Sequence, residues 1–188
     1  MVDQIQIPDS FPDAGLVAGK RVVITGASRG LGALLAHAFS QAGASVALVA
    51  RTEKDLKTVA AALSGPCLVM SGDVTDEDFN ESVADAAVGE WGGVDVWICN
   101  AGISPIVASP RETDAVVWRQ VVDVNLTGAF LGARAAARVM GEGGRLIFTA
   151  SVLGERPRKG LSRTAPRRPG WSAWPRLSHS IWRPQASR

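Results

Sequence analysis

The chain has 188 residues, of which 46% are hydrophobic, and a net charge of +2, which together predict a single globular domain with a buried core. No apolar stretch is long enough to cross a bilayer, and residues 1–18 hold acids and prolines where a signal peptide would be apolar. The two cysteines, Cys67 and Cys99, lie in apolar runs without the spacing of zinc or redox motifs. We therefore expect a cytoplasmic protein with reduced thiols, no metal site and no membrane segment.

Short apolar runs alternate along the chain with segments of helical periodicity. In chain order, they predict a strand at 21–25, a helix at 31–41, a strand at 45–50, a helix at 53–63 with Thr52 as its N-cap, a strand at 67–70, a helix at 76–88, a strand at 94–99, a long helix at 112–140 and a strand at 145–150. Apolar strands separated by helices are typical of a parallel sheet covered on both faces. The sequence therefore predicts an α/β fold, a doubly wound parallel sheet in three α/β/α layers, truncated after its fifth strand.

A glycine-rich segment joins the first predicted strand to the first predicted helix. Glycines let the backbone turn sharply and approach a pyrophosphate, and the helix N-terminus presents free N–H groups to it. An ordinary glycine turn is the alternative, but the position at the first strand-to-helix turn favours dinucleotide binding in a Rossmann-type fold. The candidate cofactor-binding residues of this turn are Thr25, Gly26, Ser28, Arg29, Gly30, Leu31 and Gly32.

The spacing of this turn, TGxxxGxG, resembles the short-chain dehydrogenase/reductase family, and the resemblance extends over residues 19–154. Asp73 and Val74 follow the third strand, where the family holds the adenine ring of its cofactor. Asn100, Ala101 and Gly102 end the fourth strand and match the NAG motif, which supports the sheet beside the cofactor. Each position alone could be a turn or capping residue, so their order along the chain carries the resemblance.

Two further positions match residues that the family uses in catalysis. Asn125, in the segment VNLTG, stands where the family keeps a catalytic asparagine, and Ser151, after the fifth strand, stands where it keeps its catalytic serine. The resemblance implies an oxidoreductase that interconverts a small-molecule alcohol and a ketone with NAD(P). It also implies that intact relatives are oligomers.

Arg51 follows the second strand, where a site for NAD would place an acid to bind the ribose 2′-hydroxyl. Together with Arg29 of the glycine turn, its guanidinium could hold a 2′-phosphate, which an acid would repel. The alternative is that Arg51 is a solvated surface residue. The sequence thus favours NADP(H) over NAD(H).

The resemblance breaks at the residues that the family's mechanism needs next. The family places a tyrosine and a lysine in a YxxxK pair on the helix after the serine: the tyrosine is the general acid/base, and the lysine lowers its pKa. The sequence contains no tyrosine. The chain is therefore expected to be catalytically impaired.

Residues 163–188 differ in character from the rest of the chain. All 18 acidic residues precede residue 156, and residues 163–188 hold four prolines and three tryptophans without helical or strand periodicity. The composition predicts a disordered tail. A basic tail that binds nucleic acid is the alternative.

A frameshift explains this tail. When synonymous codons are chosen for residues 163–188 and read from the third base, they spell YSASKAGVVGLAPTLALDLAPAGIT, which contains the missing YxxxK pair. The recovered tyrosine falls about thirteen residues after Ser151, the spacing that the resemblance implies. Loss of one C from CTC TCC CCG TAC would produce Leu161, Ser162 and Arg163.

The predicted organisation is an N-terminal extension at 1–18, an incomplete NAD(P)-binding Rossmann domain at 19–162 and an aberrant tail at 163–188. Three functions remain open: an oxidoreductase inactivated by a frameshift, a non-catalytic dinucleotide-binding module, and a nucleic-acid binder.

Overall fold

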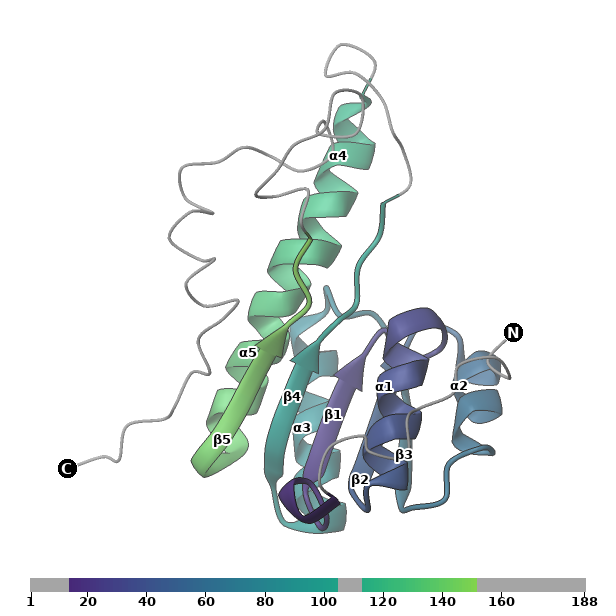
Figure 1. Cartoon of the computed structure of the whole chain (residues 1–188). Helices are drawn as coiled ribbons and strands as arrows, with labels where there is room; N and C mark the ends of the chain where they lie inside the picture. The colour runs from purple at the N-terminus through teal and green to yellow at the C-terminus, as the bar shows by residue number, and fades with distance from the viewer. Residues whose placement is uncertain (1–13, 105–112, 152–188) are drawn as a thin grey trace, which may run out of the picture.

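A computed structural model describes residues 14–104 and 113–151, which form one parallel sheet with helices on both faces (Figure 1). The strand order is β3-β2-β1-β4-β5, and every neighbouring pair is parallel. The strands are β1 (Arg21–Thr25), β2 (Ser45–Ala50), β3 (Cys67–Ser71), β4 (Val94–Cys99) and β5 (Met140–Phe148). β2 and β3 lie on one side of β1, and β4 and β5, which follow in the chain, lie on its other side. This order is that of a Rossmann-type fold, so the fold prediction is confirmed.

The helices cover the sheet in two layers. α1 (Gly30–Gln41) and α2 (Glu53–Ala60) lie on one face, and α3 (Glu77–Trp91) and α5 (Gly128–Val139) lie on the other (Figure 1). α4 (Ala115–Val122) and the π-helical turn η2 (Asp123–Thr127) precede α5 and extend past the carboxyl ends of the strands. A short 3₁₀ turn, η1 (Ala14–Leu16), precedes β1. The three α/β/α layers follow the prediction.

Alternate side chains of each strand point to opposite faces, which gives two hydrophobic cores. Val22 and Ile24 of β1 pack with residues of α1 and α2, whereas Val23 between them packs with residues of α3 and α5. All three side chains are fully buried, as is Trp97 of β4 in the second core. Burial on both faces explains why the central strands are apolar throughout.

The long helical stretch predicted over 112–140 is present as α4, the π-helical turn and α5, which follow one another from Ala115 to Val139. The π-helical turn lies between α4 and α5, where the side chain of Asn125 bonds the backbone of a distant loop. Its C-terminus is at Val139, because Met140 adopts extended backbone and pairs with Val94 as the first residue of β5. The strand predicted at 145–150 therefore begins five residues earlier and ends at Phe148.

Smaller differences concern the ends of other helices. α2 ends at Ala60, three residues before its predicted end, and α3 continues to Trp91, where Gly92 adopts a left-handed conformation. Thr52 is the N-cap residue of α2, as predicted, but its side chain makes no capping hydrogen bond. Backbone geometry at such termini depends on contacts that periodicity does not describe.

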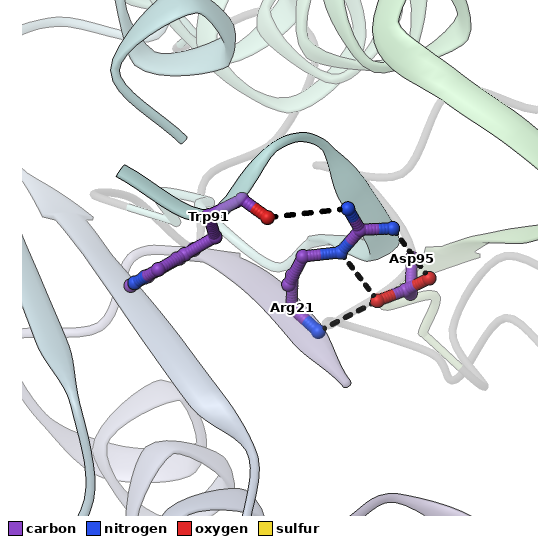
Figure 2. A network of polar contacts seen from close by, with 3 residues as sticks. All are labelled: Arg21, Trp91 and Asp95. Atoms are coloured by element: carbon purple, nitrogen blue, oxygen red, sulfur yellow. Dashed lines mark hydrogen bonds and ion pairs between the residues drawn. The ribbon is translucent and has the colours of Figure 1, made fainter. Parts of the chain in front are cut away.

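An ion pair joins β1 and β4 at the amino-terminal edge of the sheet (Figure 2). The Arg21 guanidinium donates to both carboxylate oxygens of Asp95, at 2.8 and 2.9 Å, and the Arg21 backbone N–H donates to the same carboxylate at 2.9 Å. A third guanidinium nitrogen donates to the Trp91 carbonyl at 3.4 Å. These contacts fix the end of the sheet opposite to the glycine turn.

Several predictions concern residues outside the described ranges, namely 1–13, 105–112 and 152–188. They include the disordered tail at 163–188, the nucleic-acid alternative and the end of the predicted domain at 162. Within the described ranges, no helix is both long and apolar enough to cross a membrane.

Candidate dinucleotide-binding site

The glycine turn lies at the carboxyl end of β1, at the centre of the sheet. Gly26 has a positive φ of 69°, and a Cβ there would lie 2.9 Å from the Cα of Ala101. At Gly32, a Cβ would lie 2.2 Å from the Gly26 carbonyl oxygen. Only glycine therefore allows the turn to fold against both α1 and the end of β4.

The outer side of the same turn is open. Gly30 has a φ of 56°, and a Cβ there would meet nothing within 4 Å. Arg29 is the N-cap residue of α1, and its side chain makes no capping hydrogen bond. The first N–H groups of α1 therefore lack a side-chain acceptor from the described part of the chain, which suits an anion at the positive end of the helix dipole.

A polar network joins the carboxyl ends of β1, β4 and β5. The buried hydroxyl of Thr25 accepts from the backbone N–H groups of Asn100 and Ala101 at 2.9 and 3.0 Å, and donates to the Ile98 carbonyl. The Asn100 amide donates to the Thr25 carbonyl at 3.0 Å and accepts from the Thr149 hydroxyl at 3.1 Å. The structure thus brings the predicted glycine turn and NAG motif into direct contact.

Asn125 bonds the chain that leaves β4. Its amide oxygen accepts from the Ile103 N–H at 2.8 Å, and its amide nitrogen donates to the Ile103 carbonyl at 2.9 Å. Gly102, next to Ile103, faces the same amide, since a Cβ there would lie 3.5 Å from its oxygen. The π-helical turn, a feature frequent at functional sites, presents Asn125 for this pairing.

Ser151 lies two residues after Thr149 at the same carboxyl edge, and it is exposed. The Thr149 N–H donates to the Cys99 carbonyl at 3.0 Å, which continues the pairing of β5 with β4. This bond and the bond to Asn100 place Thr149, two residues before Ser151, beside the Asn100 network. Ser28 and Leu31 occupy the open side of the glycine turn, where Leu31 is 49% exposed.

Arg51 and Asp73 lie at the ends of β2 and β3. Arg51 and Arg29 are exposed, and neither forms an ion pair with another described residue. Asp73 accepts from both the N–H and the hydroxyl of Thr75 at 2.9 Å, and thereby shapes the turn before α3. Val74 is buried, and its carbonyl accepts from the Asn80 amide at 2.8 Å.

Sequence reasoning missed three residues of this edge: Thr149, Ile103 and Asn80. Thr149 and Ile103 carried no signal, because their partners are 49 and 22 residues away in the chain. Asn80 did carry one, since it is a polar residue at the helical spacing of the buried stripe of α3.

Comparison with known protein families identifies the family to which this chain belongs. The family model described as short chain dehydrogenase matches residues 20–163. The chain belongs to this family of oxidoreductases, whose members bind NAD(P).

Among curated relatives, the chain is 41% identical over 123 residues to 3beta-hydroxysteroid dehydrogenase 1 of Eggerthella lenta, a match that covers 63% of this chain and 46% of that protein. It is 35% identical to cis-4-hydroxycyclohexanecarboxylate dehydrogenase of Sinomonas cyclohexanicum, covering 73% of this chain and 57% of the relative. The chain therefore spans about half the length of these curated relatives.

Solved structures of short-chain dehydrogenases have a similar fold. A short-chain type dehydrogenase/reductase from Mycobacterium marinum is 38% identical and superposes with a TM-score of 0.73, covering 79% of this chain and 64% of the other. A putative short-chain alcohol dehydrogenase from Sinorhizobium meliloti is 34% identical with a TM-score of 0.71, covering 77% and 59%.

Proposed function

We propose that this chain binds NADP(H) through its glycine turn and has lost most of the alcohol–ketone chemistry of its family. The observation that carries the binding is the turn itself, closed on its inner side by Gly26 and Gly32 and open at the N-terminus of α1. In this proposal the first N–H groups of α1 hold the pyrophosphate, and Asp73 and Val74 border the adenine. Bound NADPH supplies the hydride in such chemistry.

The preference for NADP(H) rests on Arg51 and Arg29. Both are exposed, Arg29 within the glycine turn and Arg51 directly after β2, and two guanidinium groups complement a 2′-phosphate in charge and hydrogen-bond geometry. The competing interpretation is that Arg51 is only solvated.

Titration of the full chain with NADPH and NADH tests this preference. We expect NADPH to bind about tenfold more tightly, and Arg51→Asp to remove the difference. Arg119→Asp is the control, because it makes the same charge change on the exposed surface of α4. Equal affinities of the parent chain for the two cofactors contradict the preference.

Impaired catalysis follows from the missing tyrosine. Asn125 is engaged with Ile103, and Ser151 lies at the carboxyl edge, but the sequence offers no phenol to move a proton at the substrate oxygen. General acid/base catalysis alone contributes about 10²- to 10⁴-fold to the rate. In this proposal, the interconversion of alcohol and ketone requires the tyrosine and lysine that the shifted reading frame recovers.

A frameshift before residue 163 would account for the loss. The family match ends at residue 163, the codon in which the shifted reading begins with the recovered tyrosine. Sequencing the gene around codon 162 is the direct test. A DNA sequence that does not spell YSASKAG in the shifted frame contradicts the frameshift.

Repair of the frame tests the catalytic deficit. One C is inserted before the codon of Arg163, translation continues in the new frame, and NADPH oxidation is followed with a panel of ketones. We expect turnover only in the repaired chain, and loss of that turnover when the recovered tyrosine is changed to phenylalanine. Comparable turnover by the unrepaired chain contradicts the deficit.

The substrate class and setting are also proposals. The names of both curated relatives specify a hydroxylated ring compound, so a small-molecule alcohol or ketone is the substrate class that we propose. A cytoplasmic location is proposed from the two cysteines, Cys67 and Cys99, which are free thiols, as is usual in a reducing compartment. Oligomerisation is proposed for the chain with the restored reading frame, from the resemblance to the family alone.

A further inference from the structure

Asn80 is a polar residue in the hydrophobic core between α3 and the sheet. It is 1% exposed and shares its face of α3 with the buried residues Val83, Ala84 and Ala87. A buried amide is costly unless its polar atoms are hydrogen-bonded, and an aliphatic side chain would fill the same place without that requirement. The amide therefore calls for an explanation beyond packing.

The bonds of Asn80 reach the loop between β3 and α3. Its amide nitrogen donates to the Val74 carbonyl at 2.8 Å and to the Asp76 carbonyl at 2.6 Å. The Asp76 carbonyl also accepts from the Asn80 backbone N–H, as expected at the start of a helix, whereas Val74 lies in the loop before α3. The bond to Val74 is thus the contact that a helix alone would not make.

Val74 is held from a second side by α5. A Cβ at Gly128 would lie 2.8 Å from a methyl carbon of Val74 and 3.1 Å from its carbonyl oxygen, so Val74 packs directly against the first turn of that helix. Gly128 follows the π-helical turn that carries Asn125. Val74, in the loop between β3 and α3, therefore lies between Asn80 and the start of α5, next to the segment that carries Asn125.

The surroundings of Asn80 also set the orientation of its amide. A Cβ at Gly132 would lie 3.0 Å from the indole nitrogen of Trp97 and 3.4 Å from the Asn80 amide oxygen, so both atoms pack against α5 at Gly132. The indole N–H is buried without a hydrogen-bond partner in the described part of the chain. A donor on that side favours the amide oxygen there, which directs the nitrogen toward Val74.

We propose that Asn80 is a positioning residue for the adenine end of the cofactor: its buried amide holds the Val74 carbonyl, and with it the segment of Asp73 and Val74 that borders the adenine in the proposed function. This inference rests on the proposed dinucleotide binding. It assigns to Asn80 an effect on one half of the cofactor, transmitted through Val74, and no contact with the cofactor itself.

The test compares the two halves of the cofactor. The full chain and its Asn80→Leu variant, which keeps a similar volume but removes the donor, are titrated with NADPH, 2′,5′-ADP and nicotinamide mononucleotide. We expect the variant to bind NADPH and 2′,5′-ADP about tenfold more weakly and nicotinamide mononucleotide unchanged. Ser82→Ala is the control, because it removes a hydrogen bond on the exposed side of the same helix and should change none of the three.

Equal weakening of both halves, or an unchanged affinity for 2′,5′-ADP, overturns the positioning role while leaving dinucleotide binding intact. If the parent chain binds neither NADPH nor 2′,5′-ADP, the proposed function fails and this inference fails with it. Should Asn80→Leu not fold, Gly128→Ala tests the same loop, because the added methyl pushes Val74 from the other side. It is also expected to weaken 2′,5′-ADP selectively, and no weakening overturns the proposal.

Discussion

At the scale of single residues, the two glycines at the start of α1 have different physical roles. A methyl group at Gly32 would meet the backbone oxygen of Gly26 at 2.2 Å, which no side-chain rotation can relieve. A methyl group at Gly30 would enter open space, and only its positive φ of 56° opposes the change. Gly32 is needed for packing, and Gly30 is needed for its backbone conformation.

We therefore expect Gly32→Ala to lower the free energy of unfolding by about 3 kcal/mol or more, as severe overpacking does. Gly30→Ala should cost about 1–2 kcal/mol, the penalty of the left-handed conformation. Urea unfolding of both variants measures the difference. Equal unfolding midpoints would show that the turn relaxes to accept a side chain at Gly32.

The ion pair at the other edge of the sheet predicts a pH dependence of stability. Hydrogen bonds from Arg21 hold the pKa of the Asp95 carboxyl below its ordinary value (Figure 2). The folded state therefore favours the ionised carboxylate, and this stabilisation is present above the ordinary carboxyl pKa and is lost as the pH falls through the lowered pKa.

Asp95→Asn measures that contribution. At pH 7 we expect the variant to be less stable than the parent by about 1–3 kcal/mol, because a charged, partly buried hydrogen-bonded pair is broken. The difference should shrink below about pH 4, where the carboxyl group protonates in the unfolded chain. Chemical unfolding between pH 3 and pH 7 gives both values, and a difference that does not change with pH contradicts the ion-pair account.

At the scale of elements, the π-helical turn is coupled to the chain after β4. The Asn125 side chain makes two hydrogen bonds with the backbone of Ile103, one as donor and one as acceptor, as a neighbouring strand would. The turn widens the helix at the residue that forms these bonds. Loss of the amide is therefore expected to release the loop and not the helices on either side.

Asn125→Ala should lower the free energy of unfolding by about 1–3 kcal/mol, since it leaves two partly buried backbone groups of Ile103 without partners. Asn125→Asp keeps the acceptor for the Ile103 N–H and should lie between the parent and the alanine variant. Hydrogen exchange at Ile103 should be faster in Asn125→Ala. Unchanged exchange at this amide would mean that the pairing does not hold the loop.

At the scale of the whole molecule, the described sheet ends at β5, which pairs with β4 and with no other described strand. Ile147 of this strand is 42% exposed. Edge strands with apolar side chains are templates for pairing with other chains, and charged residues suppress that pairing. We therefore expect this chain to self-associate through β5.

Sedimentation velocity over a range of protein concentrations tests the association. Ile147→Lys should shift the distribution toward monomer, whereas Val88→Lys, a similar change at an exposed residue of α3, should not. Identical behaviour of the two variants would show that the edge of β5 is not the contact.

The sequence by itself determined the parts of this protein that depend on local chemistry. Apolar runs placed all five strands, because a buried parallel strand needs apolar side chains on both faces. The glycine spacing placed the turn after β1, since positive φ and close backbone approach require residues without a Cβ. The missing tyrosine is likewise a property of the sequence alone.

Only the tertiary structure decided which distant groups meet. The order of the strands brings Thr25 beside Asn100, and Arg21 beside Asp95, across 75 and 74 residues of chain. The pairing of Asn125 in the π-helical turn with Ile103 is a contact of the same kind, since Ile103 lies outside this helical segment. Hydrogen bonds of this kind depend on which strands become neighbours, and the periodicity of a single segment contains no information about its neighbours.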